Sequence, residues 1–332
     1  METNEMMVRL RRVAPRCAQG AGDVTGLRML TGGASQAIWS FDVHTAQGAV
    51  PLVMRCARHW SADSEARGPD MATEAALLQV AKSGDVPVPG VRTILQPEDE
   101  LGEGYVMDRV EGETQGRKLA RAPAFDAVRP RLAYECGAIM ARIHALPVAA
   151  LPPLRTGWAA GECHEWVQRY RRGGSQRPVL ELAVRWLQAN APEPSGPATL
   201  VHGDFRNGNL MIGPDGVRAV LDWELAHVGD PMEDLGYFCV NAWRFGNIDQ
   251  PAGGFGSREQ LFAGYESVSG HQVDPARVHF WEVFGTFKWG VSCDSMGHAF
   301  IQGTDPRLER AAVGRRASET EIDLLQLLAP RT

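Results

Sequence analysis

The fold is decided by residues 199–235, which read TLVHGDFRNGNLMIGPDGVRAVLDWELAHVGDPMEDL. Within this stretch, two short apolar runs, Leu210–Ile212 and Val217–Leu221, flank the sequence GPDG at 213–216. Glycine, proline and aspartate in that order are turn chemistry, so the pattern predicts a β-hairpin. A tight HGD loop, residues 202–204, comes just before the hairpin, with a glycine that permits an unusual backbone angle.

Three oxygen-bearing side chains are arranged around this hairpin. Asp204 precedes it, Asn209 stands where it begins and Asp222 follows where it ends. Since a hairpin brings its ends together, Asn209 and Asp222 are expected side by side, as a hard oxygen site suited to Mg²⁺. Asp204 is close enough to face the same point, where it would orient an acceptor hydroxyl and take its proton. The pattern predicts phosphoryl transfer from ATP.

The compound pattern HGD, Asn five residues after the aspartate, DWE thirteen later and then GDPxxDL resembles the aminoglycoside phosphotransferase and choline kinase-like family. The resemblance implies a protein-kinase-like fold, Asp204 as catalytic base, and Asn209 and Asp222 as metal ligands. We place His202 and Arg206 in the same catalytic loop, His202 as the residue that fixes the loop. Single residues of these types are ordinarily turn residues, but the whole set in register favours the site.

Composition limits the other possibilities. The chain has 332 residues, 44% of them hydrophobic and 22% charged, as in a globular protein, and its net charge of −6 disfavours nucleic acid as a partner. We expect no membrane span and no obligate protein partner. None of the six cysteines forms a CxxC pair, which predicts buried free thiols and a cytoplasmic protein. Residues 1–26 are expected to be a solvated, partly helical lead-in.

The front part is interpreted as a nucleotide lobe at residues 27–107. Strand-like runs are expected at 27–31, 36–43, 50–56, 91–95 and 104–107. Gly32, Gly33 and Ser35 join the first two runs, and a glycine-rich turn there can lay backbone N–H groups on phosphate oxygens, although such a turn is also a common hairpin connection.

In protein kinases, a cation on the third strand binds the ATP phosphates. The chain has only three lysines, at 82, 118 and 288, and none lies in that strand, so Arg55 is the candidate. A surface arginine on an edge strand is the alternative. The sequence of residues 71–82 predicts a helix, and Glu74, in the first turns of this helix, is expected to pair with Arg55. A helix-capping carboxylate is the alternative for Glu74.

A hinge is expected at residues 108–112. Its backbone would bind adenine, with Met107 packed near the ring and Arg109 as a further nucleotide contact. Ordinary strand core is the alternative for any single residue here. Residues 113–332 form the expected helical lobe, with helices at 131–145, 280–293 and 311–328. Asp230 is interpreted first as a helix cap and, by the resemblance, as a brace below the catalytic loop. The fold class is therefore α+β: a small antiparallel sheet with one helix, then a larger helical lobe.

The acceptor is expected to be a small molecule. Only seven residues separate Asp222 from Asp230, which leaves no room for the activation segment of a protein kinase. Residues 113–332 carry 25 acidic and 23 basic side chains, which argues against a polycationic antibiotic. The KWGV run at 288–291 and the GRRASETEIDLL ending at 314–325 resemble a branch that includes kinase-like domains fused to acyl-CoA dehydrogenases. A hydroxyacyl-CoA or related metabolite is the preferred acceptor; an antibiotic phosphotransferase and a non-catalytic nucleotide-binding pseudokinase are the alternatives.

Overall fold

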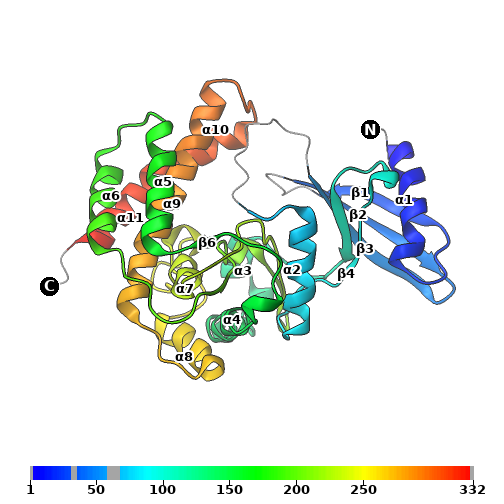
Figure 1. The fold of residues 1–332 in the computed structure, drawn as a ribbon, viewed down its shortest axis with the longest axis horizontal. Coiled ribbons are helices and arrows are strands. Elements are labelled where there is room, and N and C mark those ends of the chain that lie inside the picture. Colours follow the sequence, from blue (N-terminus) through cyan, green and yellow to red (C-terminus); the bar gives the residue numbers. More distant parts are fainter. Residues whose placement is uncertain (1–2, 31–35, 58–67, 330–332) are drawn as a thin grey trace.

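The computed structural model describes residues 3–30, 36–57 and 68–329. It has the α+β, two-lobed architecture that the sequence predicts, with a small sheet at one end and a larger helical lobe beside it (Figure 1). Helix α2 (Met71–Ser83) lies between the sheet and the helical lobe, and α1 (Thr3–Cys17) lies on the far side of the sheet. Among the described residues, no helix has the length and apolar character needed to cross a membrane.

The sheet of the small lobe is antiparallel, with the strand order β1-β2-β3-β5-β4. Its strands are β1 (Val24–Leu30), β2 (Gln36–Thr45), β3 (Gly48–Ala57), β4 (Val91–Ile94) and β5 (Gly104–Asp108). Successive side chains of β3 alternate between the two faces. Leu52 and Met54 join the core under α1, whereas Val53 joins the core that includes α2. The same alternation places Arg55 on the α2 face, which is the face toward the helical lobe.

Helix α1 corrects the expectation of a solvated lead-in. Met6, Leu10 and Val13 are buried and recur at helical spacing, so they form an apolar stripe that packs on the sheet. The arginines that dominate this segment lie on the other side of the stripe or at its edge, and Arg16 pairs with Asp99. The apolar stripe is difficult to detect in the sequence, because it takes up only one residue in three or four of a charged segment. The small lobe therefore carries two helices, not one.

The helical lobe is built around α9 (Pro275–Ile301), whose central turns are buried. The remaining helices are α3 (Gly116–Arg121), α4 (Arg129–His144), α5 (Ala159–Arg172), α6 (Pro178–Asn190), α7 (Met232–Phe238), α8 (Arg258–Ser269), α10 (Leu308–Gly314) and α11 (Ala317–Leu328). Short 3₁₀ turns span Pro97–Asp99, Pro123–Phe125, Val148–Ala150, Asn207–Asn209 and Asn241–Trp243.

The single closing helix expected at 311–328 is wrong, because the chain breaks between α10 and α11 and both pieces pack on α9. The break follows Gly314, where an added Cβ would lie 2.5 Å from the Cα of Gly297 in α9. The two backbones are therefore in close contact at this point, which a larger residue at 314 would prevent.

Two small sheets hold the loops of the site. A three-stranded sheet has the order β6-β10-β7, and β8 pairs with β9 as the predicted hairpin. Their bounds are β6 (Thr156–Gly157), β7 (Thr199–Val201), β8 (Leu210–Gly213), β9 (Gly216–Val220) and β10 (His227–Gly229). All six cysteines are buried and free, as the sequence predicts.

The packing of α1 can be tested with two substitutions on the same helix. Leu10 is fully buried, so Leu10→Ala is expected to lower the free energy of unfolding by about 2–5 kcal/mol. Val8 is 50% exposed, and Val8→Ala is expected to change it by less than about 0.5 kcal/mol. Chemical denaturation measures both, and equal effects would contradict the docking of α1 on the sheet.

Candidate active site

The HGD loop leaves β7 through a sharp turn at Gly203. Gly203 has φ +77°, in the left-handed region that side chains disfavour. A Cβ at this position would also lie 2.6 Å from the carbonyl oxygen of Leu225. Both conditions require glycine, and the turn directs Asp204 away from the strand.

A buried carboxylate fixes this loop from below. One oxygen of Asp234, on α7, accepts from the backbone N–H of His202 and the other from that of Gly203, both at 2.9 Å. His144 at the end of α4 lies 3.0 Å from the same carboxylate. Burial alone would raise the pKa of Asp234, but the bonds from His144 and the loop together hold it below its usual value. Asp234 therefore stays ionised at neutral pH.

Asp230, which the resemblance suggested as the brace, has a different role. It accepts from the backbone N–H of Met232 at 3.0 Å and from the indole of Trp281 at 3.0 Å, and it pairs with Arg277. These contacts fix the start of α7 against α9. The loop is instead held by Asp234, four residues later. Asp234 is the second aspartate of the GDPxxDL pattern, so the sequence showed its position but not the groups that it contacts.

His202 is buried and links the loop to the end of the hairpin. Its Nε2 lies 3.1 Å from the carbonyl oxygen of Leu221, and its Nδ1 accepts from the backbone N–H of Asp204 at 3.2 Å. Burial lowers its pKa, so the ring is neutral and carries its proton on Nε2. The ring also packs on Trp223, with centroids 4.7 Å apart. A neutral ring with both nitrogens engaged positions the loop and is not available to carry a proton.

Asp204, Arg206 and Asn209 lie together in front of this loop. The amide nitrogen of Asn209 donates to the Asp204 carboxylate at 2.6 Å and to its carbonyl oxygen at 3.0 Å. Arg206 donates to the other carboxylate oxygen at 3.1 Å, and its guanidinium lies over the Trp243 ring. Because its nitrogen is bonded to Asp204, the amide oxygen of Asn209 is the atom that could bind a metal.

The hairpin brings Asp222 to the same place. The backbone N–H of Leu221 donates to the carbonyl oxygen of Asn209 at 2.8 Å, so the two ends of the hairpin are adjacent. Asp222 has φ +66°, an uncommon conformation for a residue with a side chain, and its side chain is 31% exposed. Such strain is characteristic of functional positions, and the exposure leaves the carboxylate accessible to a ligand.

Arg55 connects the small lobe to this group. Its guanidinium donates to Asp222 at 2.8 Å and to Gln36 at 2.7 Å, and it lies 3.2 Å from Glu74 on α2. Glu74 is fully buried, and burial raises its pKa although Arg55 opposes the shift. Sequence reasoning missed Gln36; a polar residue at the start of a strand otherwise rich in apolar and aromatic residues was the available signal.

The structure describes only some of the other residues that the sequence predicts as nucleotide contacts. Gly32, Gly33 and Ser35 lie outside the described residues. Met107 is buried in β5 and belongs to the core that contains α2. The guanidinium of Arg109 bonds Ser40 at 3.0 Å and Asp42 at 3.0 Å, both on β2, so its side chain braces the sheet.

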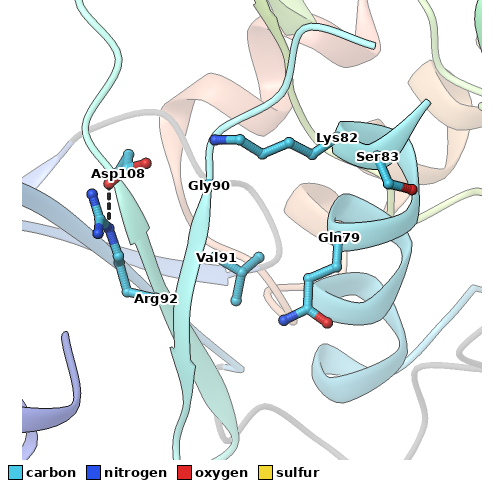
Figure 2. Close-up of a pocket in the computed structure, with 7 residues that line it drawn as sticks. All are labelled: Gln79, Lys82, Ser83, Gly90, Val91, Arg92 and Asp108. Carbon is cyan, nitrogen blue, oxygen red and sulfur yellow. Dashed lines mark hydrogen bonds and ion pairs between the residues drawn. The ribbon is translucent and has the colours of Figure 1, made fainter. Parts of the chain in front are cut away.

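Asp108 of the hinge faces a hollow on the side of α2. This hollow has a volume of about 450 Å³ and is lined by Gln79, Lys82, Ser83, Gly90, Val91, Arg92 and Asp108. Figure 2 shows the Asp108 carboxylate held by Arg92, at 2.6 Å. None of the lining residues belongs to the HGD loop or the hairpin, so this hollow is separate from the Asp204 group.

Comparison with known proteins places the chain in a family. A model described as the phosphotransferase enzyme family matches residues 28–271. The chain belongs to this family. The match includes the HGD loop, the hairpin and the strand that carries Arg55.

Individual proteins are also similar to this chain. Acyl-CoA dehydrogenase family member 11 of Pongo abelii is 29% identical over 218 residues, which are 61% of this chain and 28% of that protein. The chain thus spans little more than a quarter of that relative's length.

Two solved structures share the fold. A Ralstonia eutropha protein assigned to the aminoglycoside phosphotransferases has a TM-score of 0.74 and 21% identity, over 96% of this chain and 97% of that chain. A ternary complex of aminoglycoside phosphotransferase APH(4)-Ia with AMP-PNP and hygromycin B has a TM-score of 0.59 and 18% identity, over 93% and 96%.

The role of Asp234 predicts a specific pH dependence of stability. Its pKa in the folded protein lies below the unfolded value of about 4, so its contribution is present above that pH and is lost as the pH falls through the folded value. Asp234→Asn is expected to lower the free energy of unfolding by about 3–5 kcal/mol at neutral pH. The difference from the native protein should shrink as the pH falls below about 4.

Denaturant unfolding at a series of pH values measures this effect. Asp126→Asn is the control, because Asp126 is 66% exposed in its ion pair with Arg129, and it should cost less than about 1 kcal/mol. A difference for Asp234→Asn that stayed constant from pH 7 to strongly acidic pH would contradict the assignment of an ionised brace.

Proposed function

We propose that the protein transfers the γ-phosphoryl group of ATP, with Mg²⁺, to a hydroxyl group of a small molecule. The observation that carries the proposal is the convergence of Asp204, Asn209 and Asp222, with Arg55 bonded to Asp222. Charge stabilisation and positioning account for most of the catalysis of phosphoryl transfer, and this group supplies both.

Asp204 is proposed as the residue that orients the acceptor hydroxyl and accepts its proton. Its carboxylate is fixed by Asn209 on one oxygen and by Arg206 on the other, so its direction is set before any substrate binds. Arg206 adds a positive charge next to the reacting group, where it would stabilise negative charge on the transferred phosphoryl group.

Asn209 and Asp222 are proposed to hold Mg²⁺. Their oxygens are hard ligands, and Mg²⁺ is commonly held by one or two protein ligands together with phosphate oxygens and water. Consistent with this, no group of three or more His, Cys, Asp or Glu side chains in residues 3–30, 36–57 and 68–329 is arranged to bind a metal by itself. When bound, the metal would neutralise charge on the phosphates.

Arg55 is proposed to bind the phosphates, oriented by Glu74 and Gln36. Arginine is permanently charged and can hold two oxygens at once, so the function of a lysine at this place can be retained. The intact Arg55–Asp222 geometry supports an active kinase over a pseudokinase. Gly32, Gly33, Ser35, Met107 and the backbone at Arg109 are proposed as the remaining nucleotide contacts.

The preferred acceptor is an anionic hydroxylated metabolite such as a hydroxyacyl-CoA. Arg206 lies beside the proposed base and donates to Asp204 at 3.1 Å, so a cation is available to an anionic acceptor at this point. The helical lobe, residues 113–332, lacks the acidic excess that would favour a polycationic antibiotic. The relation to an acyl-CoA dehydrogenase family member supports the same class of acceptor.

The first test concerns Asp204. Asp204→Ala should reduce phosphoryl transfer by about 10²–10⁴-fold, because the hydroxyl loses its proton acceptor. The affinity for Mg²⁺ and ATP, measured by calorimetry, should change little. A variant that keeps native turnover would overturn the role of this residue.

The second test concerns the acceptor. Purified protein is incubated with Mg²⁺ and ATP and either a hydroxyacyl-CoA or hygromycin B at equal concentration, and the products are examined by mass spectrometry. We expect phosphate on the CoA thioester, with Asp204→Ala as the matched inactive control. Phosphorylated antibiotic with unmodified thioester would instead favour the antibiotic phosphotransferase.

A further inference from the structure

Lys288 stands out against the composition of the chain. The protein uses 31 arginines and only three lysines, yet a lysine occupies the middle of the buried helix α9. Its side chain is 7% exposed, and its ammonium donates to the carbonyl oxygen of Gly203 at 2.8 Å. Gly203 is the residue directly before Asp204, so the ammonium lies one peptide unit from the proposed base.

The pocket around this ammonium is small and aromatic. The Nζ atom lies 4.9 Å from the ring centroid of Tyr237 and 5.6 Å from that of Trp166. A compact ammonium with three rotatable donors fits such a space, whereas a planar guanidinium is larger and fixed in shape. The geometry therefore gives a reason for lysine at 288 in a chain that otherwise prefers arginine.

Tyr237 lies against the same ammonium. Its ring is buried in contact with Lys288, and burial, together with the negative charge of Asp204, raises the pKa of its hydroxyl. Lys288 thus reaches Asp204 through the Gly203 carbonyl on the backbone, with the Tyr237 ring packed on the ammonium. Asp234 accepts from the backbone N–H groups of His202 and Gly203 in the same loop. The loop is therefore fixed both through its N–H groups and through the Gly203 carbonyl.

Acidic groups lie behind Lys288. Glu233 on α7 lies 3.8 Å away, and the same side chain lies 3.2 Å from His227. Glu162 on α5 also acts on Lys288 through space, but it is paired with Arg155. Each glutamate also contacts a second basic group, so the Lys288 ammonium lies within a buried network of opposite charges behind the loop.

We propose that Lys288 and Tyr237 are positioning residues for Asp204: the ammonium fixes the Gly203–Asp204 peptide through the Gly203 carbonyl, and the Tyr237 ring holds the ammonium in place. The inference rests on the proposed function, since it assumes that Asp204 is the proton acceptor. Neither residue is placed in contact with substrate; both act through Asp204.

The test compares Lys288→Met, Lys288→Arg and Tyr237→Phe with the native protein. The reaction measured is Mg²⁺-dependent hydrolysis of ATP without added acceptor, followed by phosphate release. Lys288→Met keeps the stem and removes the ammonium that fixes the peptide, so kcat should fall on the order of 10²-fold while the KM for ATP is unchanged.

The other two variants separate charge from shape. Lys288→Arg retains the charge, but kcat should still fall because the guanidinium does not fit the space beside Tyr237. Tyr237→Phe keeps the ring beside the ammonium, so its kcat should exceed that of Lys288→Met. Lys118→Met is the matched control, because Lys118 is 55% exposed and bonds Glu113, and it should behave as the native protein.

Thermal unfolding establishes which variants are folded. A folded Lys288→Met with native kcat would overturn the inference. If Lys288→Met does not fold, Lys288→Arg decides, and native kcat in that variant would overturn it. Asp204→Ala is measured in parallel: native hydrolysis there would mean that the proposed role of Asp204 itself has failed, which distinguishes the two outcomes.

Discussion

The site depends on one buried carboxylate, that of Asp234. A loop as tight as His202-Gly203-Asp204 turns its backbone N–H groups inward, where they need acceptors, and Asp234 supplies one oxygen to each. A carboxylate can remain ionised in that position only because His144 and the loop bond it from several sides. The direction of Asp204 follows from this arrangement, so a residue that takes no part in the reaction sets the geometry of the reaction.

The second constraint is the ion pair between Arg55 and Asp222, which joins the small lobe to the hairpin. In the proposed reaction, Arg55 and Asp222 would each give up this bond and contact magnesium-bound ATP instead. Asp222 would bind the metal and Arg55 the phosphates, so each charge keeps a partner of opposite sign throughout. Glu74 and Gln36 remain bonded or paired to Arg55, which keeps its guanidinium in the cleft during that exchange.

The sequence predicts the lobes, the hairpin and the elements that carry the Asp204 group, because these depend on local patterns: turn residues, strand periodicity and the distance between motif residues along the chain. It does not predict contacts between distant segments. Lys288 lies 85 positions from Gly203, and only the path of α9 brings the two together. The docking of α1 was not predicted, because the apolar stripe is narrow and lies in a segment rich in arginine. The roles of Asp230 and Asp234 were not predicted either, because the sequence does not show which of the two faces the loop.

The most direct test of the account is a crystal structure with Mg²⁺ and AMP-PNP. The account predicts one magnesium ion about 2.1 Å from the Asn209 amide oxygen and from the Asp222 carboxylate, on the nucleotide phosphates, with Asp204 facing the terminal phosphate. Arg55 should have moved its hydrogen bond from Asp222 to phosphate oxygen. A metal and triphosphate bound without Asn209 and Asp222, or with Asp204 directed away from the terminal phosphate, would contradict the central claim.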